Sequence, residues 1–272
     1  PDFAKARQCA WSTLGTTDSP LEGAPILMMS YANGRGGGRN WPLAFRFACA
    51  SHSAPAELSL RIEHLYRLMT NSRHSDQIDF CDDITSGLMQ GWCESIPLAK
   101  QAAKRESKLQ GLVARLDPAQ TFAYNRLKDA AAKFIAAQSS NEVELSGTMR
   151  AVFVLEQKDR NWEDFQKLLA SFLLGKLPNV ASLQLQDSDL KLQAIYSELL
   201  SMRELKANTC DRSEFGTITD QGIKETQELW LAYREAWQVF ATSVKPKFAR
   251  ALDAKLAVQR TRQLQAIAQG EN

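Results

Sequence analysis

The sequence has few of the side chains on which common enzyme sites depend. Its only histidines are His52, His64 and His74, and no two of them have the i, i+4 spacing of a helical metal pair. It also lacks a Cys-x-x-Cys pair, a Gly-x-Ser-x-Gly nucleophile elbow and a Walker loop. We therefore expect no metal site, no cofactor and no nucleotide-dependent chemistry.

The chain also lacks a strong net charge and a long apolar run. Its 33 Lys and Arg residues against 31 Asp and Glu residues give a formal charge of +2, which is no footprint for nucleic acid. The longest near-apolar run, Ala24 to Tyr31, is far shorter than the roughly 20 residues that cross a bilayer. We expect a globular chain with no nucleic-acid partner and no integral membrane segment.

The residues that are abundant predict an all-α fold of helical bundles. From Pro97 to the end the chain is rich in Ala, Leu, Lys, Glu and Gln, and no alternating apolar–polar segment is long enough for a strand. Asp117 and Pro118 are typical of a helix start and predict a helix over 117–137. A second helix, over 220–240, has an apolar seam at alternating spacings of three and four, formed by Ile223, Thr226, Trp230, Tyr233, Trp237 and Phe240.

The two helices indicate a duplication, because each lies between two further amphipathic segments. Leu177-Pro178-Asn179 is the natural joint between the copies. We expect three regions, namely an N-terminal helical segment with a Gly-rich loop over 1–76 and two helical repeats over 77–178 and 179–272. The basic residues between Lys245 and Arg262 are interpreted as a solvated helix face, and Arg260, on the apolar side, is expected to have a buried partner.

Five cysteines allow two disulfides with one thiol left over, or five reduced and buried thiols. On an unbroken helix Cys81 and Cys93 would lie about 18 Å apart, beyond disulfide reach, but Gly87 and Gly91 are positions where the helix can break. Each cysteine can alternatively pair elsewhere. The arrangement we favour is Cys9–Cys49 and Cys81–Cys93, with Cys210 unpaired.

Two further features have both a functional and a structural interpretation. The Asn33–Asn40 stretch has glycine at four of the six positions from 34 to 39, so Arg35 and Arg39 are expected to project from a flexible loop, either into a partner's acidic cleft or simply into solvent. The carboxylate pairs that are candidates for acid–base chemistry, with solvated or capping roles as the alternative, are Asp82 with Asp83 and Glu142 with Glu144.

Several motifs together resemble the LprI-type lysozyme-inhibitor family of small helical domains. One is the segment bounded by Cys81 and Cys93. A second helix motif is matched by Asp189, Leu192, Tyr196 and Leu199. The most specific stretch is Gln-x-x-Trp-Leu-x-Tyr-Arg-Asp/Glu-Ala, which is matched by Gln227, Trp230, Leu231, Tyr233, Arg234, Glu235 and Ala236. A closing motif is matched by Arg260, Thr261 and Leu264. The likeness covers about residues 80–270, as two diverged copies.

The resemblance implies a periplasmic protein, mature after removal of a signal peptide, that performs no reaction. It would bind and block an envelope-degrading enzyme, such as a lysozyme or a type VI secretion effector with phospholipase or muramidase activity. The aromatic motif residues are then expected in the core, with Arg234 or Arg260 paired to an acid such as Asp189. The alternatives are a small envelope hydrolase that uses paired carboxylates and a structural envelope adaptor.

Overall fold

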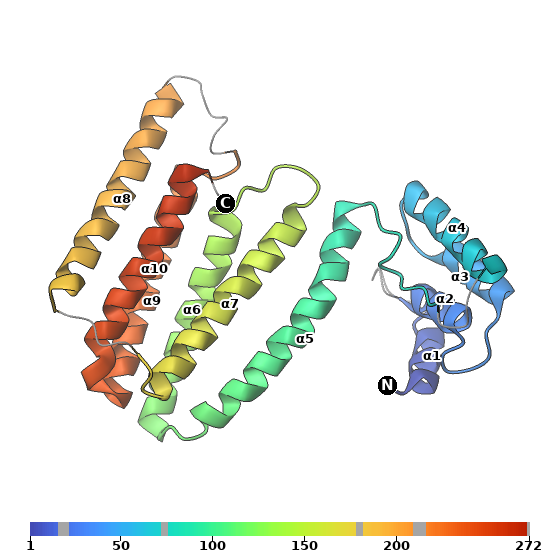
Figure 1. Ribbon diagram of the computed structural model, residues 1–272, viewed down its shortest axis with the longest axis horizontal. Helices are drawn as coiled ribbons and strands as arrows, with labels where there is room; N and C mark the ends of the chain where they lie inside the picture. Colours follow the sequence, from blue (N-terminus) through green and yellow to red (C-terminus); the bar gives the residue numbers. More distant parts are fainter. Residues whose placement is uncertain (16–21, 72–75, 178–181, 209–215, 271–272) are drawn as a thin grey trace. The chain divides into compact units, whose positions relative to one another are not determined.

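The computed structural model describes residues 1–15, 22–71, 76–177, 182–208 and 216–270. Within these ranges the secondary structure consists of ten α-helices and one 3₁₀ turn, with no strand, which confirms the predicted all-α class (Figure 1). None of these helices is both long and apolar enough to span a bilayer. His74, Cys210 and the predicted joint residues Pro178 and Asn179 lie outside the described residues.

The chain forms two compact units, unit 1 (Pro1–Ser95) and unit 2 (Ile96–Asn272). The predicted boundary at residue 76 does not coincide with the division between these two units. The segment after it belongs to unit 1, because Ile78, Phe80 and Met89 are buried in the core of that unit. The predicted boundary at residue 178 separates no units, since both expected repeats share one core.

Unit 1 is built around a helix that is buried along most of its length, α2 (Gly23–Asn33). An added Cβ at Gly23 would lie 1.9 Å from the carbonyl oxygen of Ala10, so only glycine permits the close approach of α1 to α2. Gly34 then ends α2 in the left-handed conformation, at φ 68°. The other helices of the unit are α1 (Phe3–Ser12), α3 (Trp41–Ala50), α4 (Pro55–Asn71) and the first turns of α5 (Gly87–Val113).

A disulfide joins Cys81 and Cys93, with their Cα atoms 5.8 Å apart, as we expected. The pairing is possible because α5 begins only at Gly87, so that Cys81 lies in a turn before the helix and Cys93 lies within its second turn. Gly91 does not interrupt the helix.

The expected Cys9–Cys49 disulfide is wrong, because both thiols are free and exposed. Each cysteine is adjacent to a fully buried alanine, Ala10 on α1 and Ala48 on α3. Neighbouring helix positions point about 100° apart, so a buried alanine turns the adjacent cysteine away from the packed face.

Unit 2 has one core that is centred on α6 and α9 and rich in aromatic side chains, among them Phe134, Phe165, Tyr233, Trp237 and Phe240. Asp117 caps α6 as predicted, through a capping box with Gln120. The helices of the unit are the rest of α5, α6 (Pro118–Asn141), α7 (Arg150–Leu173), α8 (Ser182–Asn208), α9 (Asp220–Val244) and α10 (Ala249–Gln269), with the 3₁₀ turn η1 (Pro246–Phe248) before α10.

The pairing of α6 with α9 repeats at its two ends. The Gln120 side chain donates to the carbonyl oxygen of Ser243 at 3.2 Å, and the Asn141 side chain donates to that of Gly222 at 3.3 Å. Gln120 and Gly222 are 102 positions apart, as are Asn141 and Ser243. Each residue of one contact therefore has its counterpart, 102 positions away, in the other contact. The helices are thus antiparallel, and their register is what an internal two-fold duplication produces.

Candidate functional site

Several residues of the Gln227–Ala236 stretch lie in the core of unit 2. Trp230 and Tyr233 are 2% and 6% exposed, and they lie in the aromatic core as their helical spacing predicts. Burial of the hydroxyl raises the pKa of Tyr233. Tyr196 is half-buried on α8, and burial also raises its pKa. These side chains stabilise the bundle and offer little surface to a partner.

Arg260 is fully buried and has an acidic partner, as expected, but the partner is Glu142. Its guanidinium donates two hydrogen bonds to the Glu142 carboxylate, at 2.6 and 2.7 Å, and a third to the Gln227 side chain at 2.9 Å. Because Glu142 follows the last residue of α6, this network ties α6, α9 and α10 together. Buried charges require such complete pairing.

Arg234 is the residue that contacts Asp189, at 2.7 Å, so this part of the expectation is right. It also donates two hydrogen bonds to Asp253, at 2.6 and 2.7 Å. Burial alone would raise the pKa of Asp253, but hydrogen bonds from Arg234 and Gln238 together with the charge of Arg234 lower it below the usual value. The same pair raises the pKa of Arg234, mainly through the hydrogen bond to Asp253. Arg234 therefore fastens α9 to α8 and α10.

The carboxylates considered for acid–base chemistry all interact with groups of their own chain. Besides Glu142, they are Asp82, Asp83 and Glu144. The Asp82 carboxylate accepts from the Asp79 backbone N–H at 2.7 Å, and that of Asp83 lies 3.1 Å from the His64 ring. The Glu144 carboxylate accepts from the backbone N–H groups of Thr217 and Ser146, at 2.7 and 2.8 Å. These contacts support capping and loop-fixing roles for the four carboxylates.

The glycine-rich loop of unit 1 differs from its expected form. Arg35 and Arg39 are both half-buried, and each guanidinium lies over an aromatic ring of the same unit, at 4.9 Å from Phe3 and 5.3 Å from Trp41. Arg35 also bonds to Gln77. Cation–π contacts of this kind favour a folded-back arginine over a projecting one. Both arginines therefore fold back onto unit 1, and their contact with a partner stays a prediction.

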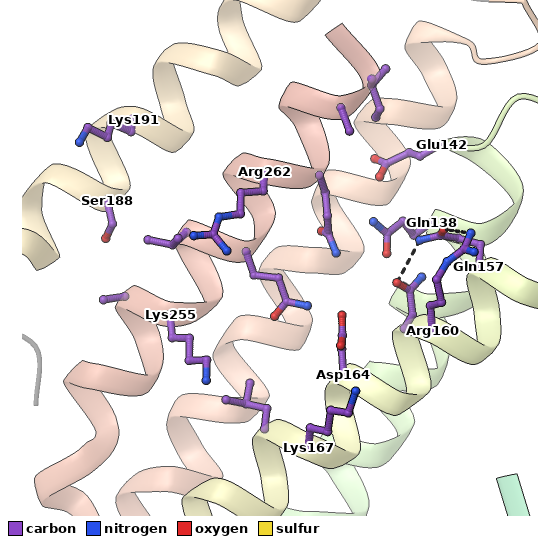
Figure 2. Close-up of a pocket in the computed structure, with 18 of the residues that line it drawn as sticks. Gln138, Glu142, Gln157, Arg160, Asp164, Lys167, Ser188, Lys191, Lys255 and Arg262 are labelled. Carbon is purple, nitrogen blue, oxygen red and sulfur yellow. Dashed lines mark hydrogen bonds between the residues drawn. The ribbon is translucent and has the colours of Figure 1, made fainter. Parts of the chain in front are cut away.

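A groove of about 980 Å³ lies between α7 and α10 in the described part of unit 2, with one side extended by α8. Figure 2 shows Lys167 and Lys255 towards one end and Arg160 and Arg262 towards the other, so α7 and α10 run antiparallel along it. The α7 wall runs from Gln157 to Ser171, which is about 20 Å of helix. None of the sequence patterns described above predicts this groove.

Positive charge predominates in the groove. Its lining contains five basic side chains, Arg160, Lys167, Lys191, Lys255 and Arg262, and three acidic ones, Glu142, Asp164 and Asp187. Glu142 is neutralised by buried Arg260, and Asp187 pairs with Lys191 at 2.5 Å. Figure 2 shows the exposed side chain of Asp164 between the two walls, where partial desolvation of its carboxylate raises its pKa. Within the described residues, Lys255 and Arg262 form no ion pair.

The groove is also rich in carboxamides, which are Gln138, Gln157, Asn161, Gln259 and Gln263. Gln138 and Asn161 are 3% and 8% exposed, and in the described structure Oε1 of Gln138 and Nδ2 of Asn161 have no hydrogen-bond partner. The Asn161 oxygen accepts from Gln157 at 3.1 Å. One acceptor and one donor, on buried side chains that we call the floor of the groove, thus lack a partner in the described structure.

An internal repeat in the sequence could have located the groove. Gln157-x-x-Arg160-Asn161 on α7 and Gln259-x-x-Arg262-Gln263 on α10 are related by the same 102-residue shift as the contacts between α6 and α9. All six side chains line the groove, so its two walls carry equivalent residues of the two copies.

Comparison of the chain with protein-family models, with curated proteins and with solved structures finds no match. The described residues contain no cluster of three or more His, Cys, Asp or Glu side chains suited to a metal ion. The groove between α7 and α10 is therefore the candidate site, argued from its own geometry.

Proposed function

We propose that this protein works by binding another protein: it is a periplasmic inhibitor or immunity protein that occludes an envelope-degrading enzyme. The target would be a type VI secretion effector such as a phospholipase or muramidase, or a lysozyme. The observation that carries the proposal is the basic, amide-lined groove between α7 and α10, placed on a rigid duplicated bundle. Inhibition by occlusion needs a preformed surface and no reacting group.

The walls of the groove are held in place by buried interactions. Arg260 and Arg234 anchor α10 to α6, α8 and α9 through ion pairs, while Phe165 and Phe172 anchor α7 to the aromatic core. A surface fixed before binding loses little conformational entropy when a partner docks. This preorganisation supports tight association, in the nanomolar range typical of inhibitor complexes.

The disulfide supports the proposed compartment. Bonds such as Cys81–Cys93 form and persist in oxidising environments, including the bacterial periplasm, and are rare in the cytosol. The same bond fixes the turn before α5 in unit 1.

Co-expression with the enzyme encoded by the neighbouring reading frame tests the proposal. Cells that produce that enzyme in the periplasm should survive when this protein is exported with it. They should die when the same protein is retained in the cytoplasm, which is the matched control. The purified pair should also form a stable complex. Death in both arms, with no complex formed, would contradict the proposed function.

A further inference from the structure

The groove between α7 and α10 has two walls with the same chemistry. On each wall two basic residues are seven positions apart, Arg160 and Lys167 on α7 and Lys255 and Arg262 on α10. This spacing is about 10.5 Å along a helix. Because the helices are antiparallel, the four cations form two facing rows (Figure 2). The ligand that complements such rows carries negative charge at intervals along its length.

The charge of the rows is only partly compensated within the chain. Lys167 pairs with Glu163 at 2.9 Å and Arg160 lies 3.6 Å from Glu156, but neither glutamate lines the groove. On the opposite wall, neither Lys255 nor Arg262 has an acidic partner within 4 Å in the described structure, although the charge of Lys255 acts on the carboxylate of Asp164. The groove therefore favours an anionic occupant, and α10 provides its less compensated wall.

The amides at the floor distinguish an extended peptide from a helix. An α-helix uses its own backbone N–H and C=O groups internally, whereas an extended chain presents both to its surroundings. A carboxamide offers one acceptor and two donors, which complement a peptide group. The unpartnered Gln138 oxygen and Asn161 Nδ2, both buried, match a backbone N–H and a backbone C=O.

From these observations we infer that the groove between α7 and α10 binds an extended, acidic peptide segment of a partner protein. The segment's carboxylates pair with the cations of the two walls, and its backbone bonds to the amides of the floor. About six extended residues span the 20 Å wall at roughly 3.3 Å per residue. This inference rests on the proposed function for the identity of the partner, but not for the chemistry of the segment.

The test uses the purified full-length protein and fluorescein-labelled (Glu-Thr)5, followed by fluorescence anisotropy. Saturable binding is expected for (Glu-Thr)5, and none for (Lys-Thr)5. The double variants Arg160→Glu/Lys167→Glu and Lys255→Glu/Arg262→Glu should each weaken binding at least tenfold. The control of equal charge and spacing is Arg126→Glu/Lys133→Glu. These two exposed positions of α6 line a separate groove with α9. The control should leave the affinity for the peptide within twofold of that of the unchanged protein.

A second variant separates hydrogen bonding from charge. Asn161→Leu should weaken binding of (Glu-Thr)5 several-fold and leave its salt dependence unchanged, whereas the charge-reversal variants should lower both affinity and salt dependence. Thermal melting identifies any variant that has failed to fold, and the charge reversals, at exposed positions, keep the inference testable if Asn161→Leu does not fold.

Three outcomes would overturn the inference: no saturable binding of (Glu-Thr)5, equal loss of affinity in the α6 control, or groove-dependent binding of oligothymidylate in place of the peptide. Its failure is distinguishable from failure of the proposed function. If the groove variants still bind and block the neighbouring enzyme with unchanged affinity, the proposed function holds and the role of the groove is contradicted. If the peptide binds in the groove but cells are not protected, the role of the groove holds and the proposed function is contradicted.

Discussion

Arg260 and Glu142 form a bidentate ion pair inside unit 2, with N–O distances of 2.6 and 2.7 Å and neither side chain more than 2% exposed. Glu142→Ala would leave the guanidinium buried and without its counter-charge. We expect it to lower the free energy of unfolding by about 3–5 kcal/mol, because removal of one partner leaves an uncompensated charge. Urea denaturation measures this loss.

Two further variants show whether that loss comes from the orphaned charge. Glu142→Leu combined with Arg260→Met removes both charges and should recover most of the stability. Glu156→Ala, which breaks a more exposed pair with Arg160, should cost about 1 kcal/mol or less. A double variant as unstable as Glu142→Ala would contradict the charge argument and point to packing instead.

Trp230 is expected to be among the most important packing residues of the bundle, because its ring is 2% exposed within the unit 2 core. Trp230→Ala should lower the free energy of unfolding by about 3–5 kcal/mol through loss of buried contacts. The adjacent Leu231, 52% exposed, provides the matched control, and Leu231→Ala should change stability by about 0.5 kcal/mol or less. Similar melting temperatures for the two variants would show that the seam does not carry the fold.

Local sequence signals were enough to predict α6 and α9 of unit 2. The Asp117–Pro118 start reflects hydrogen bonds within one helical turn, and the seam from Ile223 to Phe240 reflects the period of one helix. Both depend on residues close in the chain. The Cys81–Cys93 bond is local in the same sense, with only 12 positions between the cysteines.

The features that were mispredicted or missed depend on contacts distant in the chain. Arg260 required a partner, but 118 positions separate it from Glu142, and only the packing of α10 against the end of α6 selects that acid over Asp189. The groove likewise forms between helices almost 100 residues apart. Its one sequence signature, the repeated Gln-x-x-Arg pattern, becomes meaningful once the two-fold register of α6 and α9 is known.

Cysteine reactivity checks the thiol assignment. Iodoacetamide should modify Cys9 and Cys49 in the folded protein, because both are free and exposed, and should spare Cys81 and Cys93 until the disulfide is reduced. Peptide mass spectrometry gives the site of each modification. Cys9→Ser/Cys49→Ser should remove two equivalents of rapid labelling without changing stability. A cross-linked peptide that joins Cys9 to Cys49 would contradict the structure.

Asp253 should make stability depend on acid pH. Its pKa is lowered by hydrogen bonds from Arg234 and Gln238 despite burial, so its carboxylate is more stable charged in the folded state than in the unfolded chain, where the pKa is about 3.9. The stabilisation is therefore fully present above about pH 4 and is lost as the pH falls through the folded value. Asp253→Asn should lower the free energy of unfolding at pH 7 by about 1–3 kcal/mol.

The same variant should also flatten the acid limb, since its amide has no proton to gain. Measured by urea denaturation between pH 7 and pH 2, the difference between the unchanged protein and Asp253→Asn should shrink as the pH falls below 4. Asp129→Asn, at an exposed position on α6, is the control and should run parallel to the unchanged protein. If Asp253→Asn also runs parallel, the Arg234 pair does not favour the charged carboxylate, and α10 must be held by its apolar contacts and by Arg260 alone.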